Sequence, residues 1–208
     1  MHNARYAILI DAGYLKQNFY KEKSTFPSAL EIKEIASSIQ QHTLLNSKEL
    51  LRVYYYDAAP FQKKVVNPLD GTEKDFSASK GTRAALKCLQ SLKVFPDFAV
   101  RLGMCLQNGW AIKNLRKNEA SSMLVQPTDI KPDIKQKGVD LRIGLDVATM
   151  AIRGTVDTIV MVTGDTDLMP ALKLARKEGL RVYMAQMGKT PLHESLITHC
   201  DQVILITL

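Results

Sequence analysis

The sequence is poor in cysteine and contains no long apolar run. Its three cysteines, Cys88, Cys105 and Cys200, are widely spaced and form no Cys-x-x-Cys pair. This argues against a disulfide framework and a zinc site, and it favours a reducing compartment, so we expect a cytoplasmic protein. No stretch approaches the roughly 18 apolar residues of a membrane span. Asp11 interrupts the apolar N-terminal run and no small-residue cleavage site follows, so we expect neither a signal peptide nor a membrane partner.

Motifs that define several enzyme classes are also missing. No Gly-x-Gly-x-x-Gly follows the first apolar segment, so a dinucleotide site has no support. The segment MGKT at 187–190 resembles the end of a phosphate-binding loop, but the earlier glycine would fall on Tyr183. A phosphatase of the haloacid-dehalogenase type would need acids at the positions of Gly13 and Met169. The sequence therefore gives no support for a dinucleotide-binding protein, a P-loop protein or a phosphatase of the haloacid-dehalogenase type.

The composition is that of a basic globular protein. Of its 208 residues 46% are hydrophobic, and 28 Lys and Arg stand against 21 Asp and Glu, for a net charge of +7. The length predicts a single domain over residues 1–208. A basic excess favours an anionic partner, nucleic acid included. The composition leaves open whether the protein forms a homo-oligomer.

Apolar strand-like segments alternate with amphipathic ones along the chain. This alternation predicts a parallel sheet covered by helices on both faces, a doubly wound α/β fold. Residues 61–75 have Asn-Pro and Asp-Gly turn signals and are expected to form a loop, and residues 108–135 an inserted hairpin or loop. The predicted strands are 6–13, 50–60, 97–107, 156–165, 181–188 and 201–208, and the predicted helices are 14–23, 28–42, 80–93, 138–154, 168–179 and 190–200.

Aspartates stand at the ends of the predicted strands. Asp11 follows AILI, Asp57 follows VYYY, and Asp165 and Asp167 follow IVMVTG. Asp140 opens the long helix before that last strand. The carboxyl ends of parallel strands meet at one edge of a sheet, where ligands bind in open α/β folds. We therefore expect these carboxylates to gather at this edge.

Clustered carboxylates repel one another unless a proton or a cation neutralises them. Oxygen ligands without nearby His or Cys suit Mg²⁺ or Mn²⁺, and such ions promote phosphate-ester chemistry. Each aspartate also has a purely structural interpretation. Asp165 or Asp167 could cap the following helix, Asp140 could favour a helix dipole, and Asp57 could end a strand. Asp146, about 120° around the helix from Asp140, would face solvent or support the site.

Four segments, AILIDAGYL, VYYYDAAP, KQKGVDLRIGLDVATMA and TIVMVTGDTDLMPALKLARKEGLRVYMAQMG, resemble the LabA-like group of NYN domains within the PIN-like nuclease superfamily. The resemblance implies a Rossmann-like α/β fold with an acidic, metal-dependent nuclease site, usually acting on RNA. By position the site would comprise Asp11, Asp140, Asp165 and Asp167. Many NYN proteins have asparagine three residues after the first aspartate, whereas this chain has Tyr14.

Three functions are compatible with this sequence. The first is a Mg²⁺- or Mn²⁺-dependent ribonuclease, in which Lys80, Lys135 and Lys137 contact substrate phosphates. The second is a non-catalytic RNA- or metal-binding regulatory module on the same fold. The third is a phosphatase or nucleotidase acting on small phosphate esters.

Overall fold

The computed structural model describes residues 4–113 and 124–208. Within them a seven-stranded sheet has the order β6-β5-β2-β1-β7-β8-β9, and β3 and β4 form a separate two-stranded sheet. All neighbours in the large sheet pair in parallel except β5 and β6, which are antiparallel. The strands are β1 (Arg5–Asp11), β2 (Glu49–Ala59), β3 (Lys64–Val66), β4 (Glu73–Asp75), β5 (Phe98–Ile112), β6 (Ile130–Lys137), β7 (Thr158–Val162), β8 (Arg181–Met187) and β9 (Gln202–Ile206).

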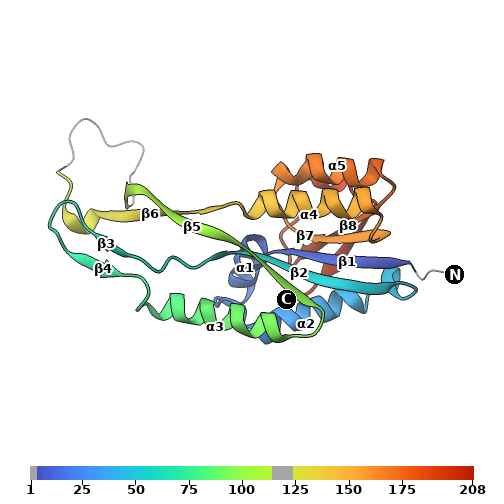
Figure 1. The fold of residues 1–208 in the computed structure, drawn as a ribbon, viewed down its shortest axis with the longest axis horizontal. Helices are drawn as coiled ribbons and strands as arrows, with labels where there is room; N and C mark the ends of the chain where they lie inside the picture. The colour runs from blue at the N-terminus through green and yellow to red at the C-terminus, as the bar shows by residue number, and fades with distance from the viewer. Residues whose placement is uncertain (1–3, 114–123) are drawn as a thin grey trace.

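Helices cover both faces of the large sheet, which confirms the predicted doubly wound α/β class (Figure 1). Helices α1, α2 and α3 bury one face, around Ile8, Ile10 and Tyr55, in a first hydrophobic core. Helices α4, α5 and α6 bury the other face, around Leu9 and Met161, in a second core. The helices are α1 (Ala12–Lys23), α2 (Ala29–Gln40), α3 (Lys80–Val94), α4 (Val139–Arg153), α5 (Met169–Lys177) and α6 (Glu194–Thr198).

Local sequence explains where several helices begin. Ser28 and Glu31 form a reciprocal capping box at the start of α2, and the Ser79 hydroxyl accepts from the Thr82 N–H at the start of α3. Gly154 ends α4 in the left-handed conformation, as a glycine C-cap does. No helix in the described part of the chain is long and apolar enough to cross a membrane.

Two predicted segments differ from the structure. Residues 61–75, expected as a loop, contain the short antiparallel strands β3 and β4, because Val65 has a buried position against which the hairpin can close. Helix α6 begins at Glu194 and not at Thr190, since the His193 ring accepts from the Ser195 N–H and caps it there. Short strands and a histidine cap are weak signals in a single sequence.

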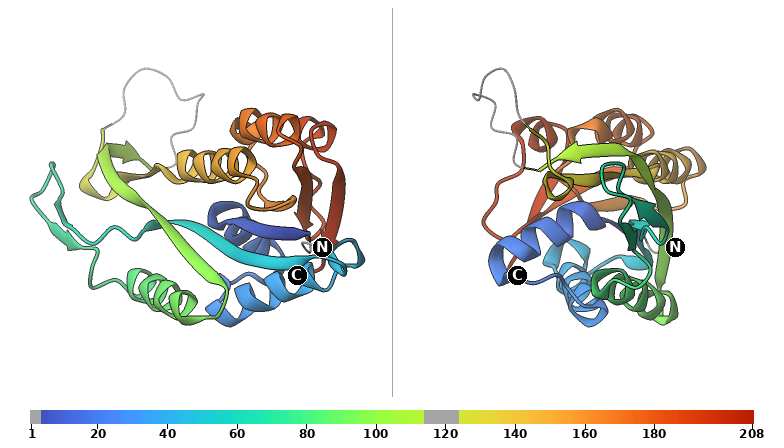
Figure 2. Two further views of the ribbon diagram at one scale, coloured as in Figure 1. Left: turned by 45° about the vertical axis from the view of Figure 1, so that its right-hand side comes forward. Right: turned by 90° about the vertical axis from the view of Figure 1, so that its left-hand side faces the viewer.

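A ribbon of β5 and β6 projects beyond the carboxyl edge of the parallel strands. β2 pairs with β5 only as far as Met104, from which point β5 pairs with β6 alone up to Ile112. The β3–β4 hairpin extends on the same side of the molecule (Figures 1 and 2), and the Asn67 side chain donates to the Pro127 carbonyl at 3.0 Å. Of the predicted insertion at 108–135, residues 114–123 lie outside the described residues.

Candidate acidic site at the sheet edge

The strand order has its topological switch point between β1 and β7. Counted along the chain, the parallel strands lie in the order 3-2-1-4-5-6, and the connections from β1 and β7 leave toward opposite sides. Ligands of doubly wound sheets bind beyond the carboxyl ends of the strands at such a point. Asp11 ends β1 there, and Gly164 and Asp165 follow the end of β7. The fold therefore brings two predicted site residues, distant in sequence, to one place.

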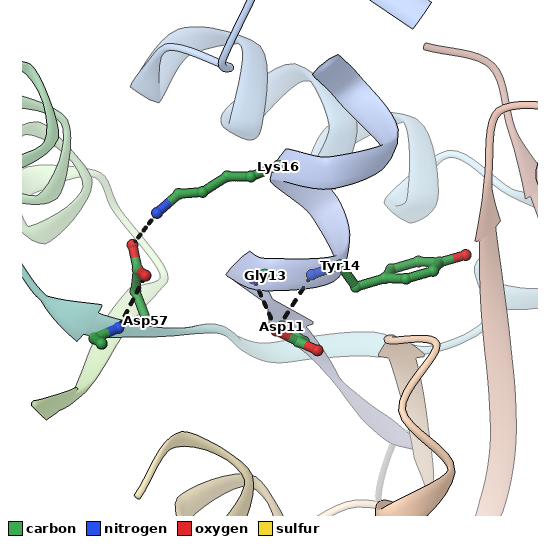
Figure 3. Close-up of polar contacts among 6 residues, drawn as sticks. Asp11, Gly13, Tyr14, Lys16 and Asp57 are labelled. Atoms are coloured by element: carbon green, nitrogen blue, oxygen red, sulfur yellow. Dashed lines mark hydrogen bonds and ion pairs between the residues drawn. The ribbon is translucent and has the colours of Figure 1, made fainter. Parts of the chain in front are cut away.

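Asp11 is the most firmly held carboxylate of this group. Its Oδ1 accepts from the Gly13 N–H at 2.8 Å and from the Tyr14 N–H at 3.4 Å, so that it caps α1 (Figure 3). Its Oδ2 accepts from the Thr163 hydroxyl at 3.1 Å. Burial raises the pKa of Asp11, these three hydrogen bonds lower it, and the charge of Asp140 raises it further. The net pKa is above the ordinary value, because burial outweighs the hydrogen bonds.

Thr163 joins the ends of β1 and β7. This fully buried residue donates its hydroxyl proton to Asp11, and the same oxygen accepts from the Asp165 N–H at 3.1 Å. The Asp165 carboxylate in turn accepts from the Asp167 N–H at 2.9 Å and begins a short 3-10 helix, Thr166–Leu168. Asp165 therefore does act as a cap, which was its structural alternative. Only its Oδ1 is used in this contact, and Asp167 is exposed.

Asp140 lies in the first turn of α4, after Gly138 turns the chain with a φ of 75°. Loss of solvation, followed by the charges of Asp165 and Asp167, raises its pKa. Asp11 thus senses Asp140, and Asp140 senses the other two. For both residues the loss of solvation is the larger cause of the raised pKa, and in the described part of the chain none of the four predicted carboxylates forms a salt bridge.

Asp57, a predicted second-tier residue, is occupied by an ion pair. Its Oδ2 lies 2.5 Å from the Lys16 ammonium, and its Oδ1 accepts from the Ala58 N–H at 2.9 Å (Figure 3). The Asp57 side chain is only 5% exposed. A carboxylate this well paired has no excess charge for a cation, so Asp57 stands beside the acidic group without being equivalent to it.

Asp146 belongs to the opposite flank of α4. It accepts from the Tyr56 hydroxyl at 2.9 Å and lies 3.3 Å from the Arg101 Nε. These partners come from β2 and β5, so the six-residue offset from Asp140 turns Asp146 toward the sheet. Its supporting role is the packing of α4 on these strands.

Tyr14 covers the end of β7 and β8. Its ring lies against Gly164, and the Met187 N–H donates to its hydroxyl at 3.5 Å. Figure 3 shows the ring directed away from the Asp11 carboxylate. Tyr14 supplies Asp11 with its backbone N–H and supports the neighbouring strands with its side chain.

The three predicted phosphate-contact lysines are exposed, at separate places. Lys80 opens α3, and Lys137 ends β6 three residues before Asp140. Lys135 lies 3.3 Å from Asp133, which offsets part of its charge. Lys137 is therefore the lysine that the chain brings nearest in sequence to the acidic group.

The acidic group offers the oxygen donors that Mg²⁺ and Mn²⁺ prefer. No group of three His, Cys, Asp or Glu side chains in residues 4–113 and 124–208 is already drawn together around a metal position. The raised pKa values of Asp11 and Asp140 show carboxylates that a cation would stabilise. The donor chemistry therefore fits a divalent ion, provided that Asp140, Asp165 and Asp167 close toward it.

Sequence reasoning did not find Thr163 or Lys16. The signal for Thr163 was its place directly after the apolar β7, where a buried hydroxyl requires a partner. Lys16 gave no such signal, because its partner Asp57 is 41 residues away.

Fold and site together define a doubly wound α/β protein with an acidic group at its switch point. Residues 5–207 match the family model of the NYN domain, and the chain belongs to this family of PIN-like nucleases. No curated protein matches the chain. Among solved structures, VPA0982 of Vibrio parahaemolyticus RIMD 2210633, a protein of unknown function, has a TM-score of 0.57 at 16% identity, over 99% of this chain and 94% of that chain. This likeness concerns the fold alone.

Proposed function

We propose that this protein is a ribonuclease that requires Mg²⁺ or Mn²⁺ and hydrolyses RNA phosphodiester bonds at the acidic group. The observation that carries the proposal is that Asp11 and Asp165 stand at the switch point of a nuclease fold and are joined there through Thr163. Membership of the NYN family supports a nucleic-acid substrate.

In this proposal the four aspartates hold the ion, directly or through water. A divalent ion bound there lowers the pKa of a water molecule and neutralises charge on the phosphodiester. Asp11 is already oriented by Gly13, Tyr14 and Thr163, so it loses little freedom on binding. Thr163 also fixes the backbone of Asp165, which keeps the two carboxylates in register.

In this proposal the substrate approaches the carboxyl ends of the parallel strands, where the acidic group lies. Lys80, Lys135 and Lys137 are candidates for contacts with phosphates on either side of the scissile bond. Such contacts position the strand and carry no sequence information.

The test is RNA cleavage by the wild-type protein and by Asp165→Asn, with single-stranded and structured RNA and Mn²⁺. The asparagine keeps an oxygen that can accept from the Asp167 N–H, so the cap survives while the charge is lost. Asp146→Asn is the matched control, because it removes a carboxylate that is held by Tyr56 and Arg101. We expect cleavage by the wild type and the control only. Equal cleavage by Asp165→Asn would place the activity elsewhere.

One observation favours the second candidate, a non-catalytic module that binds RNA or metal. The acidic side chains in the described residues are not gathered into a group of three around a metal position. This module would bind RNA or Mn²⁺ without turnover on any substrate. Absence of cleavage with retained binding would select it.

We also propose a subgroup, a domain extent and a cellular compartment for this protein. We place the chain in the LabA-like subgroup on the four motif segments, and we treat residues 1–208 as one domain with 108–135 as an insertion. The three free cysteines fit the reducing cytoplasm.

A further inference from the structure

A groove of about 890 Å³ lies between α2 and α3. Its size is that of pockets which bind ligands the size of nucleotides. Most of its lining is apolar and comes from the start of α2 and one side of α3, where Ala84, Ala85 and Leu89 form the wall. Its polar lining includes Lys16, Asp57 and Lys87. The four carboxylates of the acidic group are not part of this lining.

One end of the groove carries exposed aromatic rings. Phe26 lines it and is 69% exposed, an unusual state for so large an apolar side chain. Tyr20, 51% exposed, lies beside it with a centroid separation of 5.2 Å. Together they form a paired aromatic surface with a free face. Phe95, also in the lining, lies under the Lys33 ammonium and against Phe98, so its ring is already engaged.

Helix α3 contributes one basic side chain, Lys87, to the groove lining. Helix α3 carries Lys80, Arg83, Lys87 and Lys93 and no acidic residue. Lys87 both lines the groove and is exposed. The helix has 15 residues, about 22 Å in length, along which several stacked nucleotides fit at about 3.4 Å each. Basic side chains near exposed aromatic rings are the combination that binds single strands without sequence preference.

The groove reaches the end of β2, the strand next to β1, which ends at Asp11. Its lining includes the Lys16–Asp57 pair, and Lys16 belongs to α1, the helix that Asp11 caps. Asp57 follows Tyr56, the β2 residue that pairs with Asp11. Figure 3 shows Asp11 at the start of α1 and Asp57 to one side of this helix, joined to it by Lys16. The neighbouring ends of β1 and β2 therefore supply one residue each to the acidic group, Asp11, and to the groove, Asp57.

We propose that this groove binds a single-stranded segment of RNA next to the scissile bond, with bases on Phe26 and Tyr20 and phosphates along α3. The choice of RNA rests on the proposed function. The observations that carry it are the exposed aromatic pair, the acid-free basic helix and the shared strand ends. Duplex RNA has no unstacked bases to offer these rings, so the groove selects single strands.

The test measures binding without metal, so that cleavage plays no part. A fluorescently labelled single-stranded RNA is titrated with protein in EDTA and followed by anisotropy at several salt concentrations. Phe26→Ala should weaken binding about 5- to 150-fold, the loss expected for one stacked base. Phe26→Trp should retain binding, and Phe26→Leu should lose it, because leucine keeps apolar area but has no π-face. Since Phe26 is exposed, these variants leave the core intact, which thermal unfolding checks.

The charged side of the groove has its own variant and control. Lys87→Gln should lower the slope of log affinity against log salt by about 0.7, the value for one lost phosphate contact to a single strand. Lys173→Gln removes another exposed lysine, from α5, which covers the other face of the sheet, and should leave the slope unchanged.

Each other result overturns the inference. Unchanged affinity in Phe26→Ala and Lys87→Gln, or equal binding of duplex RNA, excludes a single-strand groove. Equal binding by Phe26→Leu and Phe26→Trp marks a generic apolar surface, as for docking of an acidic amphipathic peptide. Failure of the proposed function looks different: the groove variants change RNA binding as described, but no RNA is cleaved when Mn²⁺ is added.

Discussion

The ring of Tyr14 occupies the space where a side chain on Gly164 would stand. A Cβ at residue 164 would lie 2.7 Å from Cε2 of Tyr14 and 2.8 Å from its Cδ2. Tyr14 stands where many NYN proteins have asparagine, and its ring fits here because residue 164, next to Asp165, is a glycine. The two residues form one packing unit at the switch point.

Gly164→Ala should therefore lower the free energy of unfolding by about 1–3 kcal/mol, the usual cost of overpacking. Denaturant titration measures it. In a Tyr14→Ala background the same substitution should cost little, because the clash is gone. Gly144→Ala is the control: its Cβ would meet only Ala171 at 3.9 Å, and alanine favours the α4 helix. A cost that persists in the Tyr14→Ala background would contradict the pairing.

Asp140→Asn should raise the melting temperature at pH 7 in metal-free buffer. The pKa of Asp140 is raised above 3.8, so the folded state binds this proton more tightly than the unfolded chain does. Stability of the wild type consequently falls as the pH rises through the raised pKa, and asparagine avoids this loss. The gain should vanish below about pH 3.8. Thermal unfolding across pH tests it; a variant less stable than the wild type at pH 7 would show that loss of solvation and the neighbouring charges do not raise the pKa of Asp140.

Mn²⁺ should stabilise the wild-type protein and stabilise Asp140→Asn much less. A ligand that binds only the folded state raises stability by about 2.7 kcal/mol at a hundredfold excess over its dissociation constant. Melting temperatures with and without Mn²⁺ measure the difference. Asp146→Asn, whose carboxylate points toward Tyr56, should keep the full response. Equal responses in all three proteins would move the metal away from Asp140.

Lys16→Met should destabilise the protein by about 3 kcal/mol, because it leaves the buried Asp57 charge without its partner. Lys64→Met breaks an ion pair of similar length, 2.7 Å, whose side chains are 61% and 49% exposed, and should cost much less stability because solvent already screens this pair. Urea unfolding of both variants makes the comparison. Similar losses would mean that the Lys16–Asp57 pair is as well solvated as the surface pair.

Tyr56→Phe should reduce stability by about 1 kcal/mol and leave RNA cleavage unchanged. The substitution removes the hydroxyl that donates to Asp146, and Arg101 remains as a partner. Unfolding and cleavage rates are measured on the same preparation. A fall in cleavage without a fall in stability would give Asp146 a role in the site.

The alternation of apolar strands with helices was enough to predict the layers, because a parallel sheet buries both faces and so needs continuous apolar strands. It also predicted that Asp11, Asp57 and Asp165 lie at or next to strand ends, as they do in β1, β2 and β7, whereas their grouping into one site stays a prediction. The strand β3 could not be predicted in this way, since KVV between polar residues is too short to show a period. The β5–β6 ribbon begins where β2 stops, and nothing within the β5 sequence marks that point.

A single sequence could not show which of the aspartates are paired with a basic side chain, because such pairs form only in the tertiary structure. Asp57 and Asp11 follow similar apolar strands, yet only Asp57 meets a lysine. The direction of Lys16 depends on how α1 packs, which is a property of the tertiary structure. Asp146 likewise receives its partners from two strands that lie far from it along the chain.

Strand β1 is made first, yet it lies in the middle of the sheet. It pairs with β2 on one side and with β7 on the other, through contacts such as Tyr6 with Thr158. During synthesis one long edge of β1 therefore stays unsatisfied until residue 158 has left the ribosome, and such an edge attracts other chains. Docking of β7 closes this edge, and the same event brings Thr163 to Asp11.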